Sequence, residues 1–405
     1  MYNILLRFIY LLSYVNFIYP KRYRDWFVEQ KKIFNKLKRN VNPVIWLHCS
    51  SVGEYEQLKP LIPGLKKINQ QITITFFSKS GYENFKDYDL ISQVSYLPID
   101  IKSKMIKFIS LVNPMMVIIS KNDIWPNMIH CLKRKNIPLY LVGCKLNQNK
   151  INNILTRKYY KICLPKFSYI FCQDKLTHDF LVSEKISNNS IIGDTRINQV
   201  WIDSKNEFKD KNIHQFINGE ITIIYGSVEN SDYSKIINTI NTQNKIKHII
   251  IPHEPNEKSV NNLLNQISKK CIIYSKLPDE NLSNYNILII DVFGILKKLY
   301  AYSNITYVGG GFKKGVHNTL EPAVYGNLIV FGPKHTNFPE TISFIKTQIA
   351  FCINGQTEFE KKIQHLIKNY KSKEEILHIT NAFFEKKEKK IDLVLNYIYQ
   401  DFNIK

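Results

Sequence analysis

The chain has 405 residues, enough for two domains with cores of their own, and a formal net charge of +22. Such a charge is typical of proteins that bind nucleic acid or an anionic membrane. The sequence has no zinc-finger or helix-turn-helix signature and no arginine-rich patch with interleaved aromatic residues, so we do not expect a nucleic-acid partner. The seven cysteines and ten histidines include no Cys-x-x-Cys, His-x-His or His-x-x-x-His pair, which argues against disulfides and a metal centre.

The first element in chain order is an almost wholly apolar segment, Tyr2–Tyr19, followed at once by the basic run Pro20–Arg24. A helix of this length would nearly span a bilayer core, although Arg7 and Asn16 make a full span marginal. No small-residue cleavage site follows, as a signal peptide would require. We expect residues 1–24 to form a membrane anchor with a basic flank, spanning the membrane or lying in its interface, and the rest to be cytoplasmic. A buried core helix is the alternative.

From residue 25 onward, short apolar runs alternate with helical ones, which is typical of parallel sheets covered on both faces. The polar stretch 201–219 interrupts the alternation and is predicted to be a linker. The sequence therefore predicts an α/β protein with Rossmann-like domains over 25–200 and 220–370 and a charged C-terminal helix within 371–405. The predicted strands are Val44–His48, Ile72–Phe77, Met116–Ile119, Leu139–Val142, Tyr169–Cys172, Ile221–Tyr225, Ile246–Ile251, Ile287–Ile290, Ile305–Val308 and Leu328–Phe331.

A carboxylate, Glu54, follows the first predicted strand after a short Ser-Ser-Val-Gly turn. Gly53 permits a tight turn, and Glu54 then begins a helix at the carboxyl edge of the sheet, where ligands of such folds bind. A carboxylate in that place can deprotonate an acceptor hydroxyl as a general base. The alternative is an acidic residue at a helix N-terminus that only complements the helix dipole, which is common.

In the second domain, several segments follow predicted strands and so share one edge of a sheet. Gly309–Gly311 would let the backbone approach a ligand closely, and a helix expected to begin at Asn318–Glu321 would offer unpaired N–H groups to an anion. Glu321 would lie where a carboxylate can reach a ribose hydroxyl. This arrangement favours a nucleotide-sugar donor site, and the alternative is a glycine turn with a capping box between Asn318 and Glu321. The other strand-end segments are Gly226-Ser227, Pro252-His253 and Phe293-Gly294-Ile295.

At these motifs the chain resembles the family of 3-deoxy-D-manno-octulosonic acid (Kdo) transferases, which move Kdo from CMP-Kdo onto a lipid A precursor in lipopolysaccharide biosynthesis. The resemblance runs over nearly the full length, including the apolar amino terminus. The motifs that carry it are Ser51–Glu54, Ile124–Asn127, Gly193–Arg196, Gly226-Ser227, Val308–Gly310, His317–Pro322 and Phe331–Pro333.

The resemblance implies a two-domain fold of the glycosyltransferase B type with an N-terminal membrane-anchor helix, and an inverting transferase that needs no metal or other cofactor. It implies Glu54 as the catalytic base and a place on the cytoplasmic face of the inner membrane. The implied partners are CMP-Kdo, a lipid A precursor and the membrane surface. Beside Ser227, the implied CMP contacts are Pro252, His253, Phe293, Gly294, Ile295, Asn318, Thr319, Leu320 and Glu321.

The chain departs from the family pattern at three places near these contacts. The family's Pro-Arg-His-Pro reads Pro252–Pro255 here, with His253 in place of the arginine, and its Gly-Glu reads Gly294-Ile295. The acidic run before Trp-Pro-Asn reads Lys121–Asp123. Two other interpretations therefore stay open: a related membrane-associated transferase, such as a lipid A disaccharide synthase that uses a UDP-sugar, and a non-catalytic lipid-binding relic.

Overall fold

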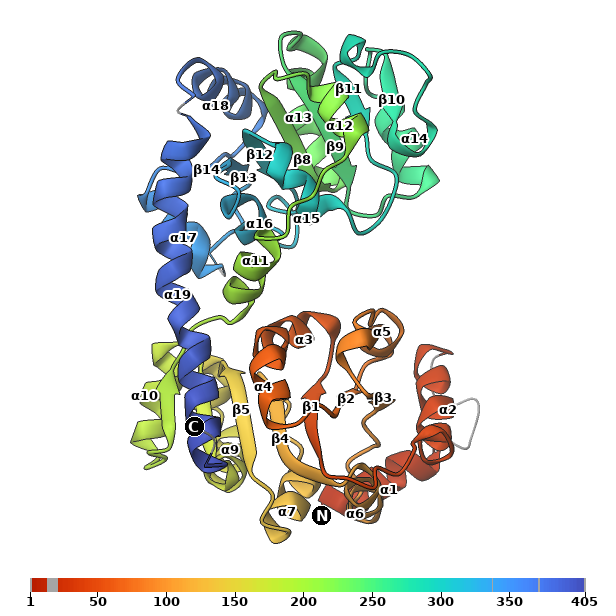
Figure 1. Cartoon of the computed structure of the whole chain (residues 1–405), viewed down its shortest axis with the longest axis vertical. Helices are drawn as coiled ribbons and strands as arrows, with labels where there is room; N and C mark the ends of the chain where they lie inside the picture. The colour runs from red at the N-terminus through yellow and green to blue at the C-terminus, as the bar shows by residue number, and fades with distance from the viewer. Residues whose placement is uncertain (1, 13–20, 337, 371, 404–405) are drawn as a thin grey trace. The chain divides into compact units, whose positions relative to one another are not determined.

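The computed structural model describes residues 2–12, 21–336, 338–370 and 372–403, which form two compact units (Figure 1). Unit 1 comprises Met1–Gln199 together with Lys387–Lys405, and unit 2 comprises Val200–Lys386. The stretch 201–219, predicted to be a linker, contains the end of one helix and a second short helix, α11 (Arg196–Ser204) and α12 (Lys211–Ile217).

Unit 1 is built on a seven-stranded parallel sheet with the order β3-β2-β1-β4-β5-β6-β7. The chain starts in the middle with β1, runs to one edge, and returns to place β4 on the other side of β1. The carboxyl ends of β1 and β4 therefore form the switch point at which such sheets bind ligands. The strands are β1 (Val44–Cys49), β2 (Ile72–Phe76), β3 (Gln93–Tyr96), β4 (Pro114–Ser120), β5 (Leu139–Cys144), β6 (Tyr169–Cys172) and β7 (Asn189–Ile191).

Helices cover both faces of this sheet, so its central strands are buried along their whole length. In β1, Trp46 packs into one core cluster, while Ile45 and Leu47 pack into a second on the opposite face. That pattern explains why the strands read as continuous apolar runs. The helices of unit 1 are α1 (Tyr2–Leu12), α2 (Lys21–Lys36), α3 (Val52–Leu58), α4 (Ile62–Ile68), α5 (Lys79–Glu83), α6 (Lys102–Val112), α7 (Pro126–Arg134), α8 (Gln148–Asn152), α9 (Ile154–Cys163) and α10 (Lys175–Ser183).

The last helix, α19 (Lys373–Asp401), begins in unit 2 and ends on unit 1. Its apolar residues Ile391, Val394 and Ile398 belong to the same core cluster as Ile45 and Leu47 of β1. The C-terminal helix predicted from the charged segment is therefore also a cover for one face of the first sheet.

Unit 2 has a second seven-stranded parallel sheet with the order β10-β11-β9-β8-β12-β13-β14. Its strands are β8 (Thr222–Val228), β9 (Lys247–Pro252), β10 (Cys271–Ile273), β11 (Ile287–Ile289), β12 (Ile305–Val308), β13 (Leu328–Phe331) and β14 (Ala350–Cys352). Its further helices are α13 (Asn230–Thr242), α14 (Glu257–Leu264), α15 (Leu296–Leu299), α16 (Leu320–Ala323), α17 (Pro339–Lys346) and α18 (Gln356–Lys368).

The predicted anchor is only partly within the described residues. Of the predicted residues 1–24, Tyr2–Leu12 form α1 and the last four begin α2, while 1 and 13–20 lie outside the described residues. Tyr2 donates a hydrogen bond from Oη to Oδ2 of Asp100, 3.0 Å away, and Asn3 accepts one from the backbone N–H of Lys102. Within the described part of the chain, we find no helix with the length and apolar character needed to cross a membrane.

Candidate active site

Glu54 lies at the switch point of the first sheet, on the first turn of α3. Ser51 is extended, which turns the chain from β1 into the helix. The Glu54 carboxylate accepts a hydrogen bond at Oε2 from the backbone N–H of Ser50, 2.6 Å away. Ser120, the last residue of β4, donates from Oγ to the backbone carbonyl of Glu54. The end of each central strand therefore helps to fix this glutamate.

The surroundings of Glu54 raise the pKa of its carboxyl group. Burial is the largest cause, and the negative charge of Asp123 acts in the same direction, while the hydrogen bond from Ser50 opposes them. A carboxylate with a raised pKa holds a proton more readily, as a general base at near-neutral pH requires. The hydrogen bond also means that Glu54 helps to order the start of α3. The structure is therefore compatible both with a general base and with a structural residue at the helix N-terminus.

Asp123 is a second carboxylate at this point, and sequence reasoning assigned it no role. It follows β4, accepts a hydrogen bond from Oγ of Ser50, and has its Oδ2 3.4 Å from Nε2 of the buried His48. Trp125 donates its indole N–H to that same Nε2, at 3.1 Å. Nε2 is then an acceptor, so the proton of a neutral His48 lies on Nδ1, which is 2.9 Å from Oγ1 of Thr75. Asp123 could have been identified from the sequence by its position just after the apolar run that forms β4, the strand next to β1.

In unit 2, the predicted donor residues follow four strands that are adjacent in the sheet: β11, β9, β8 and β12. Phe293 and Gly294 lie in an exposed turn after β11, with Ile295 half-buried. Pro252 is the buried last residue of β9, and His253 beside it is exposed. The fold therefore brings these residues to one edge of the second sheet, as expected for parallel strands.

The backbone after β12 approaches that of β8 closely at this edge. A Cβ atom on Gly309 would lie 2.3 Å from the carbonyl oxygen of Ser227 and 2.8 Å from Cα of Val228, so this position requires glycine. A Cβ atom on Gly226 would meet the side chain of Tyr300, with its hydroxyl 2.1 Å away. Ser227 has a backbone φ of 52°, a left-handed conformation that residues other than glycine rarely adopt. Such strain at a strand end is typical of functional sites.

The helix expected at Asn318–Glu321 is a single turn, α16, whose N-cap residue is Thr319. The predicted capping box is only partly right. Asn318 accepts from the backbone N–H of Leu320 through Oδ1 and donates from Nδ2 to Oε1 of Glu321, 2.9 Å away. A helix this short contributes little dipole, so any anion contact here depends on individual N–H groups. Thr319 and Leu320 are buried.

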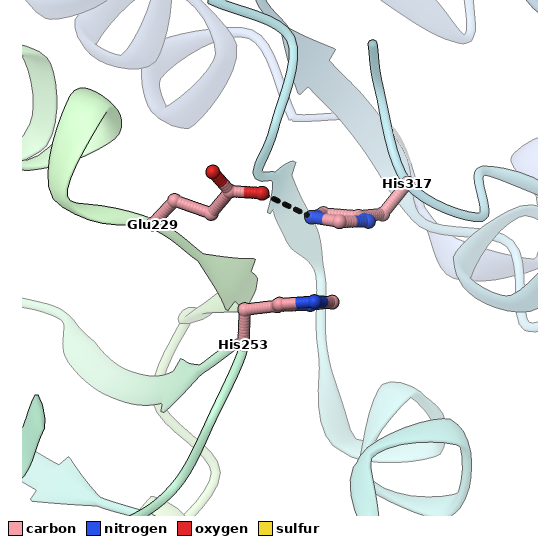
Figure 2. A group of neighbouring side chains, drawn as sticks. All are labelled: Glu229, His253 and His317. Atoms are coloured by element: carbon pink, nitrogen blue, oxygen red, sulfur yellow. Dashed lines mark ion pairs between the residues drawn. The ribbon is translucent and has the colours of Figure 1, made fainter. Parts of the chain in front are cut away.

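Beside these residues, two histidines and a glutamate form a cluster, which we call the His2Glu cluster: Glu229, His253 and His317 (Figure 2). The imidazole rings of His253 and His317 stack, with centroids 4.4 Å apart and planes 12° from parallel. Nε2 of His317 lies 3.3 Å from Oε1 of Glu229. Burial, followed by the neighbouring His253, lowers the pKa of His317. Sequence reasoning gave neither Glu229 nor His317 a role.

A separate cavity of about 960 Å³ lies elsewhere in unit 2. It is lined by the connection between α11 and α12, by the start of α12, and by Ala301, Tyr302 and Tyr325. It contains none of the predicted donor residues, so it is not the site that the strand ends define.

Comparison with known proteins shows which family the chain resembles. The family model for "3-Deoxy-D-manno-octulosonic-acid transferase (kdotransferase)" matches residues 23–199. The chain is 26% identical to the 3-deoxy-D-manno-octulosonic acid transferase of Aquifex aeolicus, over 88% of this chain and 96% of that protein. It is also 26% identical to the enzyme of that name from Haemophilus influenzae, over 94% of this chain and 91% of that one. Residues 23–199 therefore match the Kdo transferase family model, and the chain is similar to Kdo transferases over most of its length.

The chain is also similar to proteins with other names. It is 27% identical to a bifunctional glycosyltransferase/methyltransferase of Fusobacterium nucleatum, of whose length it spans 63%. Among solved structures it is similar to a UDP-GlcNAc 2-epimerase from Neisseria meningitidis, with a TM-score of 0.62 and 14% identity over 89% of this chain and all of that one. A glycosyltransferase from Rickettsia africae has a TM-score of 0.56 and 12% identity over 90% and 98% of the two chains. These structures support the two-domain fold of the glycosyltransferase B type.

Proposed function

We propose that this protein moves Kdo from CMP-Kdo to a hydroxyl group of a lipid A precursor. The observation that carries the proposal is the half-buried carboxylate of Glu54, which has a raised pKa and lies at the switch point of the first sheet. Glu54 would take the proton of the acceptor hydroxyl as its oxygen bonds to the anomeric carbon of Kdo. The bond from that carbon to the phosphate oxygen breaks in the same step, and CMP leaves.

The donor would lie at the strand ends of unit 2. Backbone N–H groups at Asn318–Glu321, where α16 begins, would face the phosphate of CMP, and Glu321 would accept from a ribose hydroxyl. The exposed turn Phe293–Ile295 after β11 leaves room for the base, since a Cβ atom on Gly294 would meet nothing within 4 Å. Charge stabilisation of the leaving phosphate by fixed donors is the main contribution that such a site can make.

The direct test is turnover. The purified chain is incubated with CMP-Kdo and a lipid A precursor, and the product is identified by its mass. We expect a product heavier than the acceptor by one or more Kdo residues, together with release of CMP. Turnover with a UDP-sugar and none with CMP-Kdo would instead favour a different transferase, and absence of turnover with either would favour a non-catalytic relic.

Asp123 should set the pH dependence of this reaction. Its negative charge helps to raise the pKa of Glu54, so Asp123→Asn should lower that pKa and move the acidic limb of the pH–rate profile to lower pH. The measurement is the transfer rate from pH 4 to pH 9. Asp87→Asn is the control, because Asp87 pairs with Lys59 instead. A uniform loss of rate with no shift of the limb would mean that Asp123 only maintains the local structure.

Glu321→Ala should weaken CMP binding by roughly 10-fold, the effect of losing one hydrogen bond to a polar ligand group. The matched control is Glu358→Ala. Glu358 occupies a similar place at the start of α18, where it accepts from the backbone and side chain of Asn354. Both variants lose a local contact worth about 1 kcal/mol of folding stability. Equal CMP affinity of the two, by calorimetric titration, would place the donor elsewhere.

We also propose that α1 attaches the protein to the cytoplasmic face of the inner membrane by lying in the interface. Tyr2 and Asn3 hold the helix to unit 1, while Ile4, Leu5 and Phe8, with Leu11 one turn further on, are 56–72% exposed. These positions, spaced i, i+1, i+4 and i+7, lie on one helix face. An apolar helix face beside a basic segment is typical of interfacial membrane binding.

A further inference from the structure

The His2Glu cluster brings three potential metal ligands to the carboxyl edge of the second sheet. Glu229 follows β8, His253 follows β9, and His317 lies in the loop after β12 (Figure 2). One ligand atom of each residue lies within 4.8 Å of those of the other two. The 3.3 Å between Oε1 of Glu229 and Nε2 of His317 is close to the roughly 3.4 Å that separates two ligands on a tetrahedral zinc ion.

Two of the three ligands come from segments whose backbone or ring is fixed by neighbouring groups. A Cβ atom on Gly310 would lie 2.8 Å from Nε2 of His317, so the ring packs against a position that only glycine allows. The carboxylate of Asp232 accepts from the backbone N–H groups of both Glu229 and Gly310. It therefore ties the segment that carries Glu229 to the turn that supports His317.

The Nε2 atom of His317 is buried and faces the carboxylate of Glu229, 3.3 Å away. A metal ion between this nitrogen and that carboxylate would bind both of them, since an imidazole nitrogen and a carboxylate oxygen are ordinary zinc ligands.

His253 is the adjustable member of the cluster. Its ring is exposed and stacks on His317, so its nitrogens lie alongside those of His317 and do not converge with them. A rotation about its Cβ–Cγ bond would direct one nitrogen toward an ion already held by the other two residues. This rotation is open to an exposed side chain, whereas the other two ligands need little movement.

We propose that the His2Glu cluster binds a divalent transition-metal ion such as Zn²⁺ and leaves one coordination position open to a phosphate oxygen. Two imidazoles and one carboxylate favour zinc over magnesium, which prefers oxygen ligands. The metal site depends only on the cluster, while its use by the phosphate of CMP rests on the proposed function.

The test uses the untagged full-length chain, because a histidine tag would itself bind zinc. The protein is freed of metal with a chelator and then titrated with Zn²⁺ against a competing chromophoric chelator. We expect one zinc ion per chain. Glu229→Gln and His253→Gln should each weaken binding by more than about 10-fold, since even groups that only support a ligand cost about 10–100-fold. His214→Gln, an exposed histidine of α12, is the matched control and should bind as the unaltered chain does.

Thermal unfolding of each variant without zinc checks that the fold is intact. Failure of the unaltered chain to bind zinc, or equal binding by the unaltered chain and both cluster variants, would overturn the metal site. CMP is then titrated with and without Zn²⁺, and we expect a gain in affinity of at least about 10-fold that the cluster variants lack. Equal CMP affinity would overturn the link to the phosphate. Kdo transfer is also measured in the presence of chelator. Transfer that persists without zinc would support the proposed function even if the metal site fails, so the two proposals are tested separately.

Discussion

Replacing Glu54 with glutamine should lower the rate of Kdo transfer by about 10²–10⁴-fold, the usual effect of losing a general base. CMP affinity should stay nearly unchanged, because the predicted donor residues belong to unit 2 and Glu54 to unit 1. Glutamine keeps the size of the side chain and can still accept from the backbone N–H of Ser50. The measurements are product formation by mass and CMP binding by calorimetry.

Glu56→Gln, on the same turn of α3, is the control for this change. Near-normal transfer by Glu54→Gln would remove the glutamate from its proposed role.

The Glu54→Gln variant should also unfold at a higher temperature than the unaltered chain at pH 8. The pKa of Glu54 is raised in the folded state, so ionisation disfavours folding at pH values above that pKa. This stability difference should disappear as the pH falls below the ordinary value of 4.5.

Replacing Ile4, Leu5, Phe8 and Leu11 together with serine should weaken binding to anionic vesicles by roughly 10²–10³-fold. Partial burial of each side chain in the interface is worth about 1 kcal/mol, and the basic segment supplies only a screened attraction. Contacts of Tyr2 and Asn3 with unit 1 remain, so the fold should be kept. The measurement is sedimentation with vesicles at increasing salt, alongside thermal unfolding.

The matched control replaces two exposed apolar residues elsewhere on unit 1, Ile154 and Leu155, which are 82% and 78% exposed. Serine at both should leave vesicle binding unchanged if membrane attachment depends on α1. Equal losses in the two variants would mean that membrane binding follows general surface hydrophobicity. Unfolding of the α1 variant would show that this face contributes to the core instead.

The sequence predicted the central strands well and missed the edges. All ten predicted strands are present, because strands buried on both faces must be continuous apolar runs. The four that were missed, β3, β7, β10 and β14, lie at the edges of the two sheets. These strands are only three or four residues long. Two of them, Gln93–Tyr96 and Asn189–Ile191, include polar residues, and the apolar runs at the other two are too short to identify a strand.

The sequence predicted which residues lie at the carboxyl edge of each sheet, but it did not predict which side chains contact one another there. Strand–helix alternation was enough to place Glu54 and the donor residues at carboxyl ends. The proximity of Asp123 to Glu54 depends on β4 pairing with β1, which the order of strands in the chain does not show. The His2Glu cluster likewise joins residues from three strand ends that are far apart in the sequence.

The way in which α19 covers the first sheet also affects how the protein is made. Ile391, Val394 and Ile398 complete a core whose other members lie mainly in the first half of the chain. A ribosome must therefore synthesise almost the whole polypeptide before the N-terminal unit can close its apolar surface. Until then that surface stays exposed on the nascent chain, where it favours aggregation or binding by a chaperone.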